Sequence, residues 1–316
     1  MVAVTCGDLA AWQLREAGLA DEVIVWRDIL HEGPVPAEGD LDELSGVRAG
    51  FLAGLGWATE AEALADFRDR NARLLASAPS APLTLWFDDN LVNQLQLLQV
   101  LTALSTVDTR EVWLAGPHTF GGVPAQRLRQ LDAERRTLTQ AHLDLGVAAW
   151  AAFRAPEPAG LAALAATETA PDTAAETAPD TAPLPALALA LTRHLRQYPG
   201  ARDGLGETER RGLAAIASGL TDFVDVFLAQ AEDDDPPFMG DTTFRHYLAR
   251  LASGPRPLLV VDGAGSYRVT EAGERVLAGA ADQIELNGID RWYGGVHLTG
   301  RAAWRWDDQQ GRIVSK

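Results

Sequence analysis

The side chains best suited to chemistry follow an apolar run at residues 23–26, in the segment VIVWRDILHEGPVP. Glu32 or His31 could act as a general base there, and Arg27 could stabilise developing negative charge. These three are the predicted catalytic residues. Gly33 and the prolines keep the segment out of a helix, and loops at the carboxyl ends of buried strands commonly carry ligand sites. The alternative is that Arg27 and Asp28 form a pair that only caps the sheet edge.

Polar side chains also follow other apolar runs, which predict strands at residues 2–5, 83–87 and 111–114. Because the carboxyl ends of parallel strands meet at one edge of a sheet, we expect these side chains to converge. The predicted ligand-binding residues are Gly7, Asp8, Asp28, Asp88, Asp89, Asn93 and His118.

Several carboxylates at one edge repel one another unless a cation offsets them. Asp8, Asp28 and Asp88 are therefore candidate ligands for a divalent cofactor, either Mg²⁺ or Mn²⁺, or Zn²⁺ if histidines join. Two simpler interpretations remain open. Acids can cluster by chance in a chain that has 44 of them, and Asp8 could serve only as a helix cap.

The elements that position these residues alternate between strand and helix, with helices expected at residues 9–17, 41–55, 59–76 and 90–104. Thr59 and Glu62 form a capping box, and the charges on these helices are expected to face solvent. This order predicts an α/β domain at 1–155, with a three-layer, Rossmann-like parallel sheet. A basic connection and a helix ending at Phe153 close it, with a cap suggested by Thr137 and Gln140. His142, on that helix, is expected to be a surface or core residue.

Residues 156–185 are rich in Ala, Thr, Pro and acid and contain ETAPDTA twice, which predicts a flexible linker. The remaining domain, 186–316, has three predicted helices followed by two short strands, the order of a winged helix. Arg245 and Arg250 on its third helix are the candidate nucleic-acid contacts. Packing or protein contact is the alternative use of this module.

The terminus IELNGIDRWYGGVHLTGRAAWRWD combines glycine pairs, which predict tight turns, with three tryptophans. Asp290, Arg291, Trp292 and His297 are predicted either to join the second domain to the first or to complete its site.

The net charge is −17, which disfavours non-specific nucleic-acid binding. A membrane partner is not expected, since no stretch resembles a membrane span. The start carries no basic signal-peptide region, and a single cysteine, Cys6, cannot build a disulfide framework. The expected location is the cytoplasm.

The chain resembles a widespread bacterial family defined by an N-terminal domain of unknown function. The resemblance lies in the stretches GDLAAWQL, VWRDILHEGPVP, WFDDNLVNQLQLLQVL, AWAAFRAPEP, FMGDTTFRHYLARL and LNGIDRWYGGVHL. Members often carry the same C-terminal module, so the resemblance implies two domains and supplies no mechanism. The chain departs from the family pattern at Leu9, where a serine is common, and at residues 88–90, where a Glu-His-Asp-like run is expected.

Together these observations predict a protein that binds a small phosphorylated or nucleotide-like ligand at the carboxyl edge of the sheet. It could act as a metal-assisted hydrolase or transferase. The alternatives are a ligand-sensing regulator that binds DNA through the winged helix, and a structural or adaptor protein.

Overall fold

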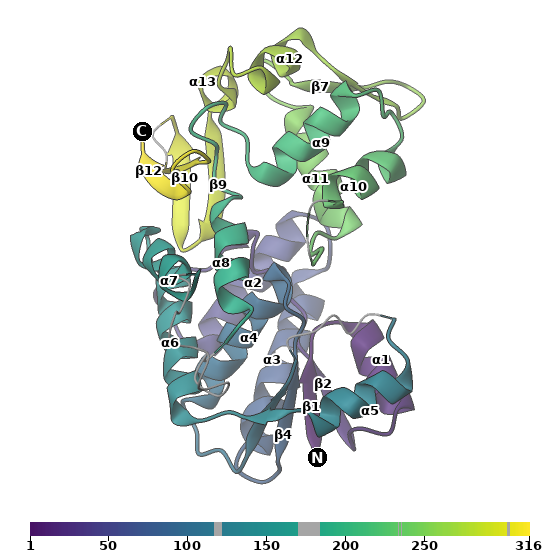
Figure 1. The fold of residues 1–316 in the computed structure, drawn as a ribbon, viewed down its shortest axis with the longest axis vertical. Helices are drawn as coiled ribbons and strands as arrows, with labels where there is room; N and C mark the ends of the chain where they lie inside the picture. The colour runs from purple at the N-terminus through teal and green to yellow at the C-terminus, as the bar shows by residue number, and fades with distance from the viewer. Residues whose placement is uncertain (117–121, 170–183, 233, 235, 302–303) are drawn as a thin grey trace. The chain divides into compact units, whose positions relative to one another are not determined.

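The computed structural model describes the chain except for residues 117–121, 170–183, 233, 235 and 302–303 (Figure 1). It divides into two compact units. The first contains residues 1–191 and 294–296, and the second contains residues 192–293 and 297–316. Because residues 117–121 and 170–183 are not described, His118 and most of the ETAPDTA repeats lie outside the described residues.

The first unit is built on a five-stranded, mostly parallel sheet with the order β2-β1-β4-β5-β6. The parallel strands are β1 (Val2–Thr5), β2 (Glu22–Val25), β4 (Leu83–Trp86) and β5 (Val112–Ala115). Their predicted positions are confirmed to within a residue or two. An entirely parallel sheet was expected, but the edge strand β6 (Arg136–Thr137) runs antiparallel to β5. This strand has only two residues, too few for a periodic signal.

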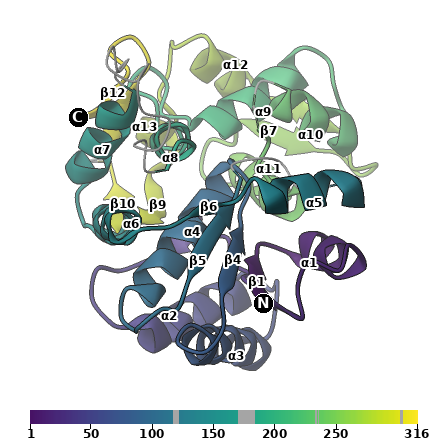
Figure 2. The ribbon, with the colours of Figure 1, turned by 60° about the horizontal axis from the view of Figure 1, so that its bottom comes forward.

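Helices cover both faces of this sheet (Figure 2). On one face, α1 (Asp8–Glu16) and α5 (Ala125–Ala133) pack on Ala3, Val23, Val25 and Trp86. The other helices are α2 (Leu41–Gly54), α3 (Glu60–Ser77), α4 (Leu91–Leu104) and α6 (Gln140–Arg154). Helix α3 contacts both β2 and α4. The first unit is thus a mixed α/β fold whose sheet lies between helices on its two faces.

Three local expectations were wrong. A helix, α5, forms where a connection was expected. Helix α6 is capped by Thr139 and not by Thr137: His142 Nδ1 accepts from the Thr139 backbone N–H at 3.0 Å, so His142 is a capping residue. Helix α7 (Ala159–Thr169) lies inside the predicted linker, because its alanines and its two leucines favour a helix.

The second unit contains the three predicted helices, α9 (Glu207–Ala217), α10 (Phe223–Ala231) and α11 (Asp241–Leu251). Strands β7 (Leu259–Val261) and β8 (Tyr267–Val269) follow as an antiparallel pair. The elements wholly within this unit also include α12 (Glu271–Leu277), α13 (Gln283–Asn287), β11 (Trp304–Asp307) and β12 (Arg312–Ser315). Helix α8 (Leu187–Leu195) and strands β9 (Ile289–Gly294) and β10 (Val296–Gly300) each have residues in both units. No helix in the described part of the chain is long and apolar enough to cross a membrane.

Candidate ligand-binding site

A cavity of about 530 Å³ lies at the carboxyl ends of β1 and β2. It brings together four predicted site residues, Gly7, Asp8, Arg27 and Asp28. The remaining lining residues are Cys6, Ile29, Leu52, Ala58, Glu62, Ala63, Asp66, Phe67, Val92 and Gln96. Its size lies within the range of small-molecule sites, and its walls are mostly apolar.

Arg27 forms the charged part of the rim and lies between two aspartates. Its Nη1 donates to Asp66 at 2.7 Å, and its Nε and Nη2 both donate to the Asp8 carboxylate. The hydrogen bond from Arg27 lowers the pKa of Asp8, and the same bond raises the pKa of Arg27. These side chains are substantially exposed, so the pairs contribute about 0–1 kcal/mol each. A ligand can therefore displace either aspartate from Arg27 at low cost.

Asp28 has a different role, because its side chain is completely buried against Arg48. Arg48 Nη2 donates to Asp28 Oδ1 at 2.7 Å, and Nε donates to the same carboxylate at 3.1 Å and 3.2 Å. The alternative in which Arg27 and Asp28 pair with each other at the sheet edge is therefore wrong. Since its carboxylate is committed to Arg48, Asp28 positions the loop that follows it.

Arg48 holds the loop through three backbone carbonyls. It donates to the carbonyl oxygens of Glu32 at 2.6 Å, Ile29 at 3.2 Å and Pro34 at 3.3 Å. His31 and Glu32 are 2% and 3% exposed and do not line the cavity. The structure thus separates both proposed bases from Arg27, because Arg48 draws the loop inward.

Gly33, in β3 (Gly33–Pro34), permits this loop path with a φ of 76°. A Cβ at this position would lie 2.5 Å from the Phe51 ring. We expect Gly33→Ala to lower the free energy of unfolding by about 2–4 kcal/mol, since left-handed strain and overpacking add. Chemical denaturation measures this.

Gly18→Ala is the matched control, because Gly18 has a φ of 67° and no atom within 4 Å of an added Cβ. It should cost about 1–2 kcal/mol, from backbone strain alone. Equal costs at the two positions would contradict the predicted clash with Phe51.

Asp88, Asp89 and Asn93 also do not line this cavity. Asn93 Oδ1 accepts from the Asp88 backbone N–H at 3.1 Å, and Asn93 N–H donates to Asn90 at 3.0 Å. Asn90 is the cap of α4, so these residues shape the start of that helix. No group of three or more His, Cys, Asp or Glu side chains suited to a metal occurs among the described residues. The candidate ligands Asp8, Asp28 and Asp88 are not assembled into such a group, and the first two are paired with arginines.

Sequence reasoning missed two buried arginines beside the cavity. Arg70 stacks on the rings of Trp26 and Phe67 at 4.4 Å and 4.3 Å, and donates to the Arg27 carbonyl. Burial lowers the pKa of Arg70 to about 10. Arg48 and Arg70 were expected to face solvent. A helical-spacing signal could have found them, because Arg70 comes three residues after Phe67, and Arg48 comes four after the buried Leu44.

Gln96 and Cys6 also line the cavity. Gln96 Nε2 donates to the Asp28 carbonyl at 2.6 Å, which ties α4 to the end of β2. Burial raises the pKa of the Cys6 thiol to about 12, and Asp88 adds to the increase. The thiol is therefore protonated and a weak nucleophile at neutral pH.

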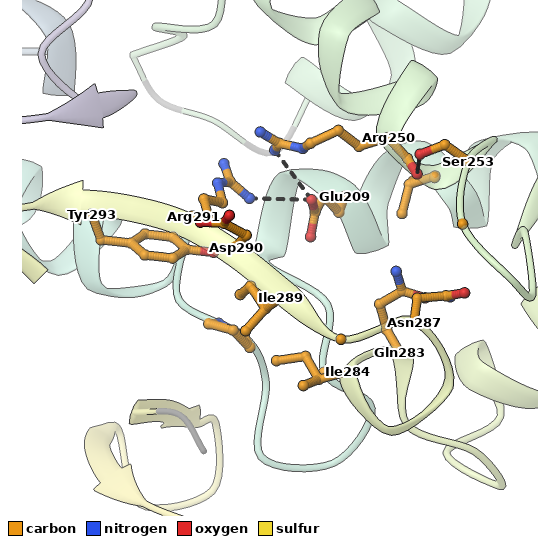
Figure 3. A pocket seen from close by; sticks show the side chains of 15 residues that line it. Glu209, Arg250, Ser253, Gln283, Ile284, Asn287, Ile289, Asp290, Arg291 and Tyr293 are labelled. Carbon is orange, nitrogen blue, oxygen red and sulfur yellow. Dashed lines mark hydrogen bonds and ion pairs between the residues drawn. The ribbon is translucent and has the colours of Figure 1, made fainter. Parts of the chain in front are cut away.

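The second unit holds a smaller polar cavity, of about 180 Å³, around Glu209 (Figure 3). Glu209 Oε1 accepts from Arg291 Nη1 at 3.1 Å and from Arg250 Nη2 at 3.3 Å. Both guanidinium groups also lie over the Tyr247 ring. Arg250, a candidate nucleic-acid contact, is therefore part of a packed cluster.

The other predicted residues of this unit make contacts within it. Arg245 lies 3.5 Å from the Phe223 ring centroid. His297 bonds Asp290 at 2.7 Å and stacks on Trp292 with the ring centroids 4.3 Å apart. These contacts leave the predicted joining or site-completing role untested.

The β9–β10 turn is as tight as its glycines predicted, with a φ of 65° at Gly294. Residues 294–296 belong to the first unit, where Gly294 O accepts from Val35 N at 2.9 Å and Gly295 N donates to Phe153 O at 3.0 Å.

A search against protein-family models and one against curated proteins found no match to this chain.

Proposed function

We propose that the first unit is a Rossmann-like domain that binds a small nucleoside-like ligand in the cavity at the ends of β1 and β2. The observation that carries the proposal is the cavity of about 530 Å³ at this sheet edge. The strand order supports it, because the chain passes from β2 on one side of β1 to β4 on the other. Open α/β sheets bind ligands where the strand order reverses.

The lining favours a flat, largely apolar ligand with polar edges. Phe67, Ile29 and Val92 offer apolar contact, while Arg27 and Asp8 at the rim can exchange hydrogen bonds with hydroxyl or amino groups. A planar base with an attached sugar has this distribution of surface.

Charge favours the nucleoside over its phosphorylated form. Asp28 is neutralised by Arg48, which leaves Asp8, Glu62 and Asp66 on the lining against Arg27 alone. A phosphate would be repelled by each carboxylate, at a cost of about 1 kcal/mol for a pair 4 Å apart even in water. We therefore propose a neutral or cationic ligand.

The proposal concerns binding and assigns no reaction. His31 and Glu32 lie outside the lining, and the raised pKa of Cys6 keeps its thiol protonated. Hydrolysis or group transfer assisted by a metal has no supporting geometry among the described side chains.

The test is thermal unfolding of the full chain with adenosine, guanosine, cytidine and uridine, each beside its 5′-monophosphate, with Mg²⁺ and with chelator. A nucleoside at about one hundred times its Kd should stabilise the protein by about 2.7 kcal/mol, a shift of a few degrees. Ala58→Phe, which fills the cavity, should abolish the shift. Ala133→Phe, at an exposed position on α5, should retain it.

Three results would contradict the proposal. The first is a larger shift with the monophosphate, and the second is a shift that survives Ala58→Phe. The third is the absence of any shift with all four nucleosides.

A winged-helix arrangement of α9–α11 with the β7–β8 hairpin remains part of the proposed organisation of the second unit. The contacts of Arg245 with Phe223, and of Arg250 with Glu209, do not favour a DNA-reading surface. We therefore do not extend the proposed function to nucleic acid, and no observation favours an adaptor role.

A further inference from the structure

A second cavity in the first unit, of about 460 Å³, has a lining different from that of the nucleoside-site cavity. Its apolar wall includes Leu44, Leu75, Ala103 and Trp150. Its polar wall includes Gln99 from α4 and Arg154 from the end of α6. The cavity is large enough for a molecule the size of a substituted benzene ring.

Gln99 offers this cavity a hydrogen-bond donor of fixed orientation. The side chain is 3% exposed, and its Oε1 accepts from the buried Trp26 indole N–H at 2.8 Å. Turning the amide over would break that bond, so Nε2 must remain the free end of the amide. Nε2 has no hydrogen-bond partner among the residues that the structure describes.

Arg154 supplies a positive charge at the same cavity. It donates to three backbone carbonyls, those of Pro36 at 2.6 Å, Glu38 at 2.7 Å and Gly39 at 3.0 Å. No carboxylate lies within 4.0 Å of its guanidinium in the described part of the chain. Burial lowers the pKa of Arg154, and attraction to the Glu38 carboxylate opposes that change. An anionic oxygen would therefore meet a cation that makes no close ion pair and lies in the field of one acid.

The acids on the lining are occupied elsewhere. Asp40 caps α2 by accepting from the backbone N–H groups of Asp42 and Glu43. Asp42 accepts from Arg68 at 2.8 Å and 3.0 Å. Asp40 keeps its negative charge, because its partners are neutral backbone groups, whereas Arg68 offsets the charge of Asp42. The hydrogen-bond donors that remain for a ligand are those of Gln99 and Arg154.

We propose that this cavity is a second binding site, which takes a small carboxylic acid with an aromatic or aliphatic body. The carboxylate accepts from Gln99 Nε2 and lies near Arg154, and the apolar body packs against Trp150 and the leucines. A carboxylate suits this wall better than an amide, because a hydrogen bond to an ionised acceptor is stronger than one to a neutral acceptor. The site is independent of the proposed nucleoside site and survives if that proposal fails.

The test uses 3-phenylpropanoate as the probe, beside its amide and the corresponding amine, 3-phenylpropylamine. Each is titrated into ¹⁵N-labelled full-length protein while the Gln99 side-chain NH₂ signals are followed. The carboxylate should shift these signals in a saturable manner, the amide should bind more weakly, and the amine should leave them unchanged.

The Gln99→Glu variant keeps an acceptor for Trp26 and replaces the Nε2 donor by a carboxylate oxygen. It should weaken binding of the carboxylate by about tenfold or more. Gln130→Glu adds the same charge at an exposed position on α5 and should leave the affinity unchanged. Ala58→Phe should also leave it unchanged, because residue 58 lines the other cavity.

The proposal is overturned if the amine binds as well as the carboxylate, or if no probe shifts the Gln99 signals at millimolar concentration. Unchanged affinity in Gln99→Glu would also overturn it. Should that variant fail to fold, the comparison of the three probes on the unaltered protein still decides between these outcomes.

Discussion

Replacing Asp28 by alanine is expected to lower the free energy of unfolding of the first unit by about 3–5 kcal/mol. The substitution leaves the Arg48 guanidinium, which is 1% exposed, without its carboxylate in a buried site. The loop should loosen as well, because Arg48 also holds the carbonyls of Ile29, Glu32 and Pro34. Chemical denaturation gives the free energy, and hydrogen exchange of peptides covering residues 25–52 reports the loop.

Two controls separate the buried pair from general effects of charge removal. Asp42→Ala breaks an exposed, solvent-screened pair with Arg68 and should leave the free energy of unfolding almost unchanged. The double variant Asp28→Leu with Arg48→Met removes both charges and should recover part of the loss. A cost below about 1 kcal/mol for Asp28→Ala would show that this pair does not hold the loop.

Replacing Glu209 by alanine should cost the second unit a similar amount, about 3–5 kcal/mol. Glu209 neutralises the buried Arg291 and the partly buried Arg250 through one oxygen, and its other oxygen caps Gly206 N–H at 3.0 Å. Removing the carboxylate leaves the two guanidinium groups near each other without this anion and exposes the start of α9. Hydrogen exchange should increase first in peptides covering α9, α11 and β9.

Glu285→Ala is the matched control for this experiment. Glu285 pairs with Arg301 at 3.6 Å with both side chains more than half exposed, so its loss should cost at most about 1 kcal/mol. Glu209→Gln should be intermediate, since the amide oxygen can still cap α9 while the charge is lost. Similar free energies for Glu209→Ala and Glu285→Ala would mean that the arginine cluster does not depend on Glu209.

The strands and main helices of the first unit could be predicted because their signals are local. Short apolar runs define β1, β2, β4 and β5, and the Thr59–Glu62 capping box marks the start of α3. Convergence of residues 7, 8, 27 and 28 follows from parallel strands alone. The remaining acids were misplaced, because periodicity gives the order of elements but not the direction of a side chain after its strand ends.

The buried charges could not be assigned to partners from the sequence. Arg48 pairs with Asp28 across 20 residues, while the adjacent Arg27 bonds Asp8 and Asp66. Which arginine meets which acid depends on how α2 and α3 pack beside β2, a tertiary property with no local signature. The cap formed by His142 was missed for a different reason, since capping boxes normally carry Glu or Gln at that position.

Helix α4 sets a limit on redesigning this protein. Gln94, Gln96 and Gln99 are all at most 3% exposed, so a scheme that scores burial alone would exchange them for leucine. Each exchange would leave a buried polar group without its hydrogen-bond partner. These groups are the Asp88 carbonyl for Gln94, the Asp28 carbonyl for Gln96 and the Trp26 indole N–H for Gln99. An unsatisfied group of this kind costs about 1–3 kcal/mol, comparable to the gain from burying a leucine side chain. Raising the hydrophobicity of this core therefore does not by itself make the domain more stable. Its engineering has to begin from the hydrogen bonds that the side chains of α4 make.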